Sequence, residues 1–244
     1  MRAVRAEVMK LRTTRTFWAL VGTTLSLVML ITVLTLALGS DPRNEDDVRS
    51  ILSTAGAGGL LMIVLGVVFS AGEYRHGTIA STLLVTPDRL RVTASQALGC
   101  AAAGAAVGIA LAALTAAVGL PWLSAKGAPS LSTGELLGLF GGGVLYTALA
   151  AALGAGVGAL LRNQVAAVVL ILVLIFVIDP ILGGLVDGYA EYSLSGLGIA
   201  LSGGSADDSA SGELLAVWQA GLIWAAYTAV LVGAAAILTS RRDI

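Results

Sequence analysis

Six uninterrupted apolar runs constrain this chain more than any other feature of its sequence. Each run is rich in Ala, Leu, Val and Gly and lacks the alternation of polar and apolar positions seen in barrel strands, which indicates helices. A helix of about 20 residues crosses the hydrocarbon core of a bilayer. The predicted spans, which define an all-α polytopic membrane protein, cover residues 17–38, 54–71, 92–120, 136–161, 165–186 and 214–238.

The composition leaves little of the chain for a soluble domain. Of the 244 residues, 57% are hydrophobic and 12% are charged, whereas about 45–50% of the residues in soluble domains are apolar. The single cysteine, Cys100, excludes an intrachain disulfide and is interpreted as a small buried hydrophobe. A formal net charge of −1 gives no support for a nucleic-acid partner. The third span exceeds the membrane thickness, so it must tilt or extend into water.

The distribution of basic residues predicts how the spans are oriented. With an even number of spans, both termini lie on one side of the membrane, and Lys and Arg mark the cytoplasmic side. Placing the N-terminus inside leaves only three of the 14 basic residues outside: Arg43, Arg49 and Lys126. We therefore expect both termini in the cytoplasm. The first apolar run is longer than the roughly 7–15 residues of a signal-peptide core, so it is interpreted as an uncleaved span.

The residues before the first span have an amphipathic pattern. Three apolar residues form a narrow stripe on a helix, with two arginines beside it: Val4, Val8 and Leu11, with Arg5 and Arg12. Such a helix can lie in the headgroup layer, so residues 1–16 are predicted to form an interfacial helix and residues 17–244 the membrane domain. The helix should bend or stop within residues 13–16. The alternative is a basic anchor that only fixes the orientation.

The longest predicted internal cytoplasmic loop lies between the second and third spans and is polar. Gly77 permits a break in the chain, and the residues after it predict a short helix whose apolar side consists of Ile79, Leu83 and Leu84. Residues 86–88 have the order N-cap, proline and acid, so we expect the third span to begin there, with Thr86 as its N-cap. An apolar side next to charged groups favours a docking surface for another protein. The alternative is a solvated loop whose charges keep it out of lipid.

The sequence E-Y-R-x-G-T-I-x-x-T-L-L-x-T-P-x-R runs from Glu73 to Arg89. Together with a basic N-terminal helix and six spans, it resembles the permease subunit of type-2 ABC exporters. The resemblance implies that this loop is a cytoplasmic coupling helix seated in a cleft of a separate ATPase subunit, with two permeases and two ATPases per transporter. The coupling positions that it implies are Glu73, Tyr74, Arg75, Gly77, Thr78, Thr82, Thr86, Pro87 and Arg89.

The resemblance also implies that the energy for transport comes from a partner. The chain contains no G-x-x-x-x-G-K-[ST] phosphate-binding loop. We therefore expect a transport subunit that is not itself an enzyme, with ATP and Mg²⁺ bound by the partner ATPases. The second permease copy would be identical or homologous, and the complex would lie among the lipids of a bacterial cell membrane. Apolar walls with almost no charge at mid-membrane favour an amphiphilic substrate over ions.

The fifth predicted span contains Asp179-Pro180, a pair that predicts a helix break toward the outer leaflet. Asp179 is expected to cap the short segment that follows; the alternative is a contact with substrate. Residues 181–201 are only partly apolar and contain several glycines, so they are predicted to form short re-entrant helices on the outer side, as in the resembled family. The lone His76 is interpreted as a loop residue, because no neighbouring ligand set accompanies it.

Glycines at small-xxx-small spacing predict close contacts between helices in the membrane. The pairs are Gly104 with Gly108, Gly138 with Gly142, and Gly154 with Gly158. We expect static close packing at these pairs, and the alternative is a sliding interface.

Two other classes of function fit the sequence less well. An ion-driven secondary transporter usually has helices broken at the midplane in two corresponding halves, whereas only the fifth span carries a break signal here. An intramembrane enzyme needs a nucleophile with its base, or paired acids, at one depth in the bundle, and Asp179 has no such partner in the predicted spans. The permease of an ATP-driven exporter is therefore the leading hypothesis.

Overall fold

The computed structural model is helical and without strands in the residues that it describes, which are 2–39, 42–75, 77, 88–204 and 214–241. The six helices in this part of the chain that are long and apolar enough to cross a membrane are Arg15–Leu38, Glu45–Arg75, Leu90–Ala125, Thr133–Leu161, Gln164–Leu185 and Val217–Leu238. Each of them overlaps one predicted span, so the prediction of an all-α chain with six helices long and apolar enough to cross a membrane is confirmed.

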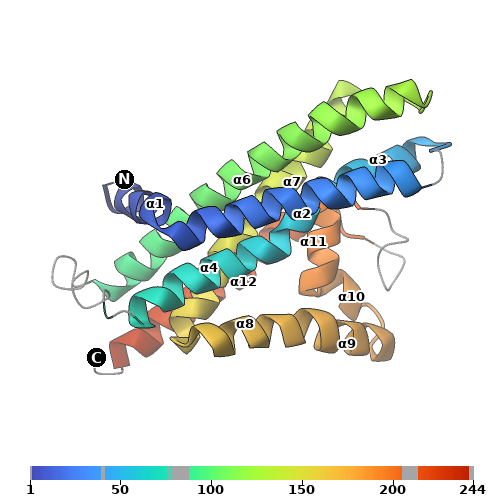
Figure 1. Ribbon diagram of the computed structural model, residues 1–244. Helices are drawn as coiled ribbons and strands as arrows, with labels where there is room; N and C mark the ends of the chain where they lie inside the picture. The colour runs from blue at the N-terminus through green and yellow to red at the C-terminus, as the bar shows by residue number, and fades with distance from the viewer. Residues whose placement is uncertain (1, 40–41, 76, 78–87, 205–213, 242–244) are drawn as a thin grey trace.

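The long helices run side by side in one bundle (Figure 1). The start of α1, the end of α4, the start of α6 and the end of α12 lie at the same end of this bundle, and α10 and α11 lie toward the other end. In chain order the elements are α1 (Arg2–Thr13), α2 (Arg15–Leu38), α3 (Glu45–Ser53), the 3-10 helix η1 (Thr54–Gly58), α4 (Gly59–Arg75), α6 (Arg89–Ala125), α7 (Thr133–Leu161), α8 (Gln164–Val173), the π-helix η2 (Leu174–Ile178), α9 (Asp179–Leu185), α10 (Tyr189–Tyr192), α11 (Leu194–Ser202) and α12 (Val217–Arg241).

Helix α7 is central to the bundle because its glycines let neighbouring backbones approach closely. A Cβ on Gly154 would collide with the backbone carbonyl of Ile63 in α4, and a Cβ on Gly158 would also meet the α4 backbone. A Cβ on Gly104 of α6 would likewise collide with the backbone of Thr147 in α7. Backbones at this distance leave little free volume, which is consistent with static packing at Gly104, Gly154 and Gly158. The predicted close contact at Gly138 is wrong, because a Cβ there would have no heavy atom within 4 Å.

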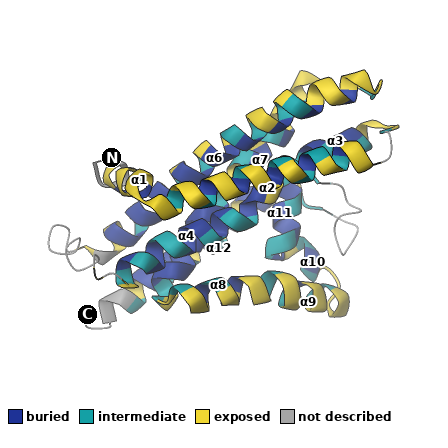
Figure 2. Cartoon of the chain, viewed as in Figure 1, coloured by how far each residue is buried: buried dark blue, intermediate teal, exposed yellow. Residues whose placement is uncertain are grey.

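The outer helices present apolar side chains to their surroundings. Figure 2 shows exposed residues along α2, α8 and α9. Only 17% of the most apolar stretch of the helix at Gln164–Leu185 is buried, against 61% for Thr133–Leu161. Exposed apolar faces of this extent are suited to lipid rather than to water.

Helix α1 packs against α6 and ends at Thr13, within the segment where the sequence predicts a stop. The Trp18 indole donates a 2.8 Å hydrogen bond to the carbonyl of Arg12, which fixes the corner before α2. Leu11 is buried, as the apolar stripe predicts, but Glu7 is buried as well. The packed face of α1 is therefore partly ionic, which the amphipathic pattern does not predict.

The helix of the second span begins before its apolar run. Asn44 caps α3, since its side chain accepts a 2.8 Å hydrogen bond from the Asp47 N–H, and Asp47 accepts one from the Asn44 N–H in return. The chain stays helical through η1 into α4. Arg49 of α3 pairs with Glu135 of α7 at 3.0 Å, which ties this extension to the first turn of α7.

Helix α6 is longer than a membrane is thick. Its 37 residues correspond to about 55 Å at ~1.5 Å per residue, whereas the hydrocarbon core measures about 30 Å. The helix must therefore tilt or extend beyond the lipid, as the length of the third apolar run predicts.

The helix of the fifth span continues through Asp179-Pro180, in place of the predicted break. Residues Leu174–Ile178 form a π-helical turn in which the Asp179 N–H donates to the Leu174 carbonyl, and α9 then continues to Leu185. In a regular α-helix, the ring of Pro180 would clash with the carbonyl four residues earlier. The wider π turn changes the hydrogen-bond pattern at this point, so the proline distorts the helix without ending it.

Replacing Gly154 with Ala should weaken the contact between α4 and α7, because the new Cβ collides with the Ile63 carbonyl. We expect the variant to lose about 1–3 kcal/mol of stability, measured as a lower melting temperature in detergent. Gly138→Ala is the matched control, since a Cβ at Gly138 has no heavy atom within 4 Å. Equal melting temperatures for the two variants would contradict the close packing at Gly154.

Candidate functional site

The structure describes five of the nine coupling positions that the resemblance implies, and these five flank the loop on both sides. The last turn of α4 holds Glu73, Tyr74 and Arg75, Gly77 follows with a φ of 68°, and Arg89 is the first residue of α6. The other coupling positions, together with His76 and the apolar side of the expected short helix, lie outside the described residues: Thr78, Ile79, Thr82, Leu83, Leu84, Thr86 and Pro87.

Helix α6 begins two residues later than the sequence predicts. Its N-cap is Asp88 rather than Thr86, because the Asp88 carboxylate accepts a 3.2 Å hydrogen bond from the backbone N–H of Arg91. A carboxylate at this position also interacts favourably with the positive end of the helix dipole.

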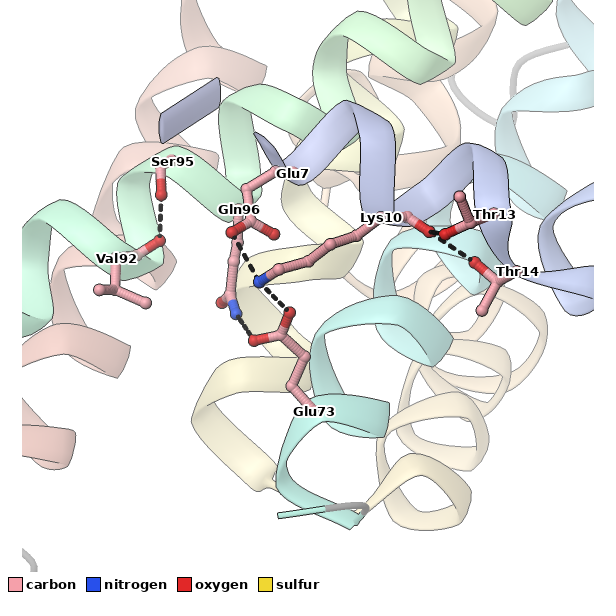
Figure 3. Close-up of polar contacts among 8 residues, drawn as sticks. All are labelled: Glu7, Lys10, Thr13, Thr14, Glu73, Val92, Ser95 and Gln96. Carbon is pink, nitrogen blue, oxygen red and sulfur yellow. Dashed lines mark hydrogen bonds and ion pairs between the residues drawn. The ribbon is translucent and has the colours of Figure 1, made fainter. Parts of the chain in front are cut away.

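Glu73 belongs to a set of four side chains that we call the polar junction: Glu7 and Lys10 of α1, Glu73 of α4 and Gln96 of α6. The Lys10 ammonium lies 3.0 Å from one carboxylate oxygen of Glu7 and 3.0 Å from one of Glu73 (Figure 3). The second oxygen of Glu73 accepts a 2.6 Å hydrogen bond from the Gln96 side-chain amide. Three helices that are far apart in sequence therefore meet at one ionic cluster.

Both carboxylates of the polar junction are buried, with 4% of Glu7 and 7% of Glu73 exposed. Removing like charges from water is costly unless they are paired, and Lys10 is the cation that both acids contact. Burial raises the pKa of Glu7, and the Glu73 carboxylate adds to this effect, while the hydrogen bond from Lys10 opposes it. For Lys10, burial favours the neutral amine, but the hydrogen bonds to Glu7 and Glu73 outweigh burial and raise its pKa.

The spacing of the residues and one glycine explain how the polar junction forms. Glu7 and Lys10 are three residues apart on α1, so they share one face of the helix. On the facing surface of α6, Gly99 leaves room for α1, because a Cβ there would lie 2.7 Å from the Cβ of Glu7. Glu73 lies in the last turn of α4, where its carboxylate contacts α1 on one side and Gln96 of α6 on the other.

The residue after Glu73 contacts a fourth helix. The guanidinium of Arg162 lies over the ring of Tyr74, 5.2 Å from the ring centroid, in a cation–π arrangement. Arg162 is the C-cap of α7 and has a φ of 54°, a left-handed conformation that is uncommon for a residue other than glycine. Adjacent residues at the end of α4 therefore bind α1 and α6 through Glu73 and α7 through Tyr74.

The polar junction can bind charge and can couple helix movements. Moving the end of α4 away from α1 would break the ion pair between Lys10 and the buried Glu73 carboxylate, so α1 and α4 are favoured to move together. Among the residues that the structure describes, no cluster of three His, Cys, Asp or Glu side chains could hold a metal ion.

Asp179 is the centre of a second buried polar cluster, which shares no residue with the polar junction. The Asp179 carboxylate is 5% exposed and accepts hydrogen bonds from the Tyr189 hydroxyl at 2.9 Å, the Ser195 N–H at 3.1 Å and the Ser195 hydroxyl at 2.8 Å. Burial, together with the hydrogen bond to Asp179, raises the pKa of Tyr189 to about 12. Asp179 therefore stabilises the start of α11. The prediction that it caps the segment directly after it is wrong.

The sequence did not predict a site role for three members of the polar junction, which are Glu7, Lys10 and Gln96. A signal exists for Gln96, because it is a large polar side chain inside an otherwise apolar predicted span, and such residues usually face the interior of a bundle. Glu7 is an acid beside the apolar stripe of a basic helix. This signal is weaker, because it indicates a buried acid only once α1 is known to pack against α6.

Comparison with protein-family models and with curated proteins finds no match to this chain. The class of the protein therefore follows from its fold: an all-helical, multi-pass membrane protein with six helices long and apolar enough to span a bilayer in the described residues.

Removing the charge of Lys10 should destabilise the contact between α1 and the bundle. We expect Lys10→Met to lower stability by about 1–3 kcal/mol, less than for a fully buried pair, because the Lys10 side chain is 42% exposed. Adding Glu73→Gln to Lys10→Met should recover part of this loss, since one of the two buried carboxylate charges is then removed. Melting temperatures of the single and double variants measure the effect, with the exposed Arg12→Met as control. No recovery in the double variant would contradict the pairing.

The raised pKa of Glu7 predicts a pH-dependent contact between α1 and α6. A carboxyl group whose pKa is higher in the folded state contributes stability below its ordinary value of 4.5, and this contribution is lost as pH rises through the folded-state pKa. We therefore expect the stability of the wild type, relative to Glu7→Gln, to fall as pH rises above 4.5. Melting curves of both proteins from about pH 4 to 8 measure the difference. A wild type that becomes more stable relative to Glu7→Gln as pH rises would contradict the prediction.

Proposed function

We propose that this chain is the membrane-spanning permease subunit of an ATP-driven exporter of the type-2 ABC class. The observation that carries the proposal is the polar junction, which joins the end of α4 to α1 and α6 directly before the loop with the coupling sequence. A partner that pulls on this loop would act on Glu73 and Tyr74, and through them on α1, α6 and α7.

The orientation proposed from the basic residues agrees with the arrangement of the helix ends. The start of α1, the end of α12 and both helix ends that flank the loop lie at one end of the bundle (Figure 1). Arg75 and Arg91 belong to these helix ends, and Arg162, the C-cap of α7, contacts Tyr74 there. We assign this end to the cytoplasm of a bacterial cell by the positive-inside rule.

The proposed transporter contains two permease copies and two ATPase subunits that bind ATP and Mg²⁺. Closure of the ATPases would displace the loop between α4 and α6 in each permease, and the helices joined at the polar junction would follow. The glycine contacts between α4 and α7 would keep these helices together during the movement. An apolar bundle interior suits an amphiphilic substrate.

At the opposite end of the bundle, α10 and α11 are proposed as the short re-entrant helices of the outer side. Asp179 supports this assignment because its three hydrogen bonds connect the end of the fifth span to Tyr189 and Ser195. Leu197 and Leu201 of α11 are fully buried, so this helix packs within the protein.

An ion-driven secondary transporter is the second candidate. The observation that favours it is Glu7, a buried carboxyl group with a raised pKa that could exchange a proton. It differs from the first candidate in its energy source, so one reconstituted system distinguishes the two.

Co-purification of the tagged chain from its native membranes should yield a second protein with a G-x-x-x-x-G-K-[ST] loop. In proteoliposomes, Glu73→Gln should reduce ATP-dependent transport by about 5–150-fold, the usual range for a coupling energy. Glu135→Gln is the matched control, because Glu135 pairs with Arg49 away from the polar junction. A chain that purifies alone and transports solute down a proton gradient without ATP would favour the second candidate.

A further inference from the structure

An open groove of about 650 Å³ lies beside the polar junction, between α1, α2, α4 and the start of α8. Its volume is within the range of about 300–1,000 Å³ that is common for ligand sites. The groove is lined differently along its length, with charged groups near the helix ends and apolar side chains farther along the spans.

The apolar part of the groove is formed by two spans. Phe17 and Leu20 lie in the first turns of α2, and Leu65, Val68 and Phe69 lie in the last turns of α4. These side chains belong to helices that are long and apolar enough to span a membrane, so this part of the groove is suited to lipid acyl chains.

Lys10 and Arg75 supply charged hydrogen-bond donors to the polar part of the groove. Lys10 uses two of its three N–H groups for Glu7 and Glu73. Arg75 is exposed and forms no ion pair with any described residue, so its guanidinium is available to a ligand. Glu73 also lines this part, but both of its carboxylate oxygens already accept hydrogen bonds. The unused groups therefore favour an anion with several acceptor oxygens.

The depth of the donors agrees with the position of a lipid headgroup. Helix α2 begins at Arg15, α4 ends at Arg75 and α8 begins at Gln164, so three helix ends surround the polar part. Basic side chains at the ends of membrane helices lie in the headgroup layer, where they attract anionic lipids.

We propose that this groove binds one anionic phospholipid, with its phosphate at Arg75 and Lys10 and an acyl chain along Phe17, Leu65 and Phe69. The charge of the unused donors and the change from polar to apolar lining both match this occupant. The site does not depend on the proposed transport function, because it requires neither an ATPase nor a substrate.

Native mass spectrometry of the delipidated full-length protein tests the proposal. With phosphatidylglycerol and phosphatidylcholine added at equal concentration, one phosphatidylglycerol should be retained preferentially. Arg75→Gln should weaken this binding about tenfold, the usual effect of losing a charged hydrogen bond, whereas Arg75→Lys should retain most of it. Val68→Trp should also weaken binding, because the larger ring fills the apolar part of the groove.

Arg91→Gln is the matched control, since Arg91 is an exposed arginine near the start of α6 that does not line the groove. Equal retention of the two lipids, or an equal loss in Arg91→Gln and Arg75→Gln, would overturn the proposal and indicate general attraction to the basic surface. Displacement of the lipid by excess inorganic phosphate would also overturn it, because the acyl chain would then contribute nothing. Melting temperatures identify any variant that fails to fold, and Arg75→Lys separates loss of charge from loss of fold.

Discussion

One ammonium group, that of Lys10, stabilises two buried carboxylates at the end of the bundle where α4 ends and α6 begins. The Lys10 ammonium lies 3.0 Å from a carboxylate oxygen of Glu7 and 3.0 Å from one of Glu73, and this pairing offsets part of the cost of burying both charges. The position of α1 on α6 and the position of the last turn of α4 both depend on this cation. Tyr74 extends the connection to α7 through Arg162.

The bundle combines close backbone contacts with buried polar contacts near its ends. Between α4 and α7, glycines bring the backbones so close that no side chain separates them, and such contacts tolerate little displacement. At the helix ends the contacts are polar: Lys10 with two acids at one end, and Asp179 with Tyr189 and Ser195 toward the other. Both sets of polar contacts involve buried carboxylates, so breaking either set is costly unless the carboxylate gains another partner.

The number and approximate positions of the spans could be predicted, whereas the polar junction could not. Its partners Lys10 and Glu73 are 63 residues apart, and Glu73 and Gln96 are 23 residues apart, so no local pattern joins them. The predicted break at Asp179-Pro180 fails for a related reason. The rule for proline describes a regular α-helix, and a single π turn satisfies the same steric constraint while the helix continues.

The sequence by itself determined that this chain is helical and has six spans, because apolar length and composition act locally and lipid requires every backbone group to be paired within its own segment. It also determined that a polar loop interrupts the apolar runs after Arg75. Only the tertiary structure decided that Glu7 is buried, that Lys10 contacts two acids, and that Asp179 stabilises α11. These outcomes depend on which helices pack together, since the energy of a charge or hydrogen bond is set by neighbours that the packing brings into contact.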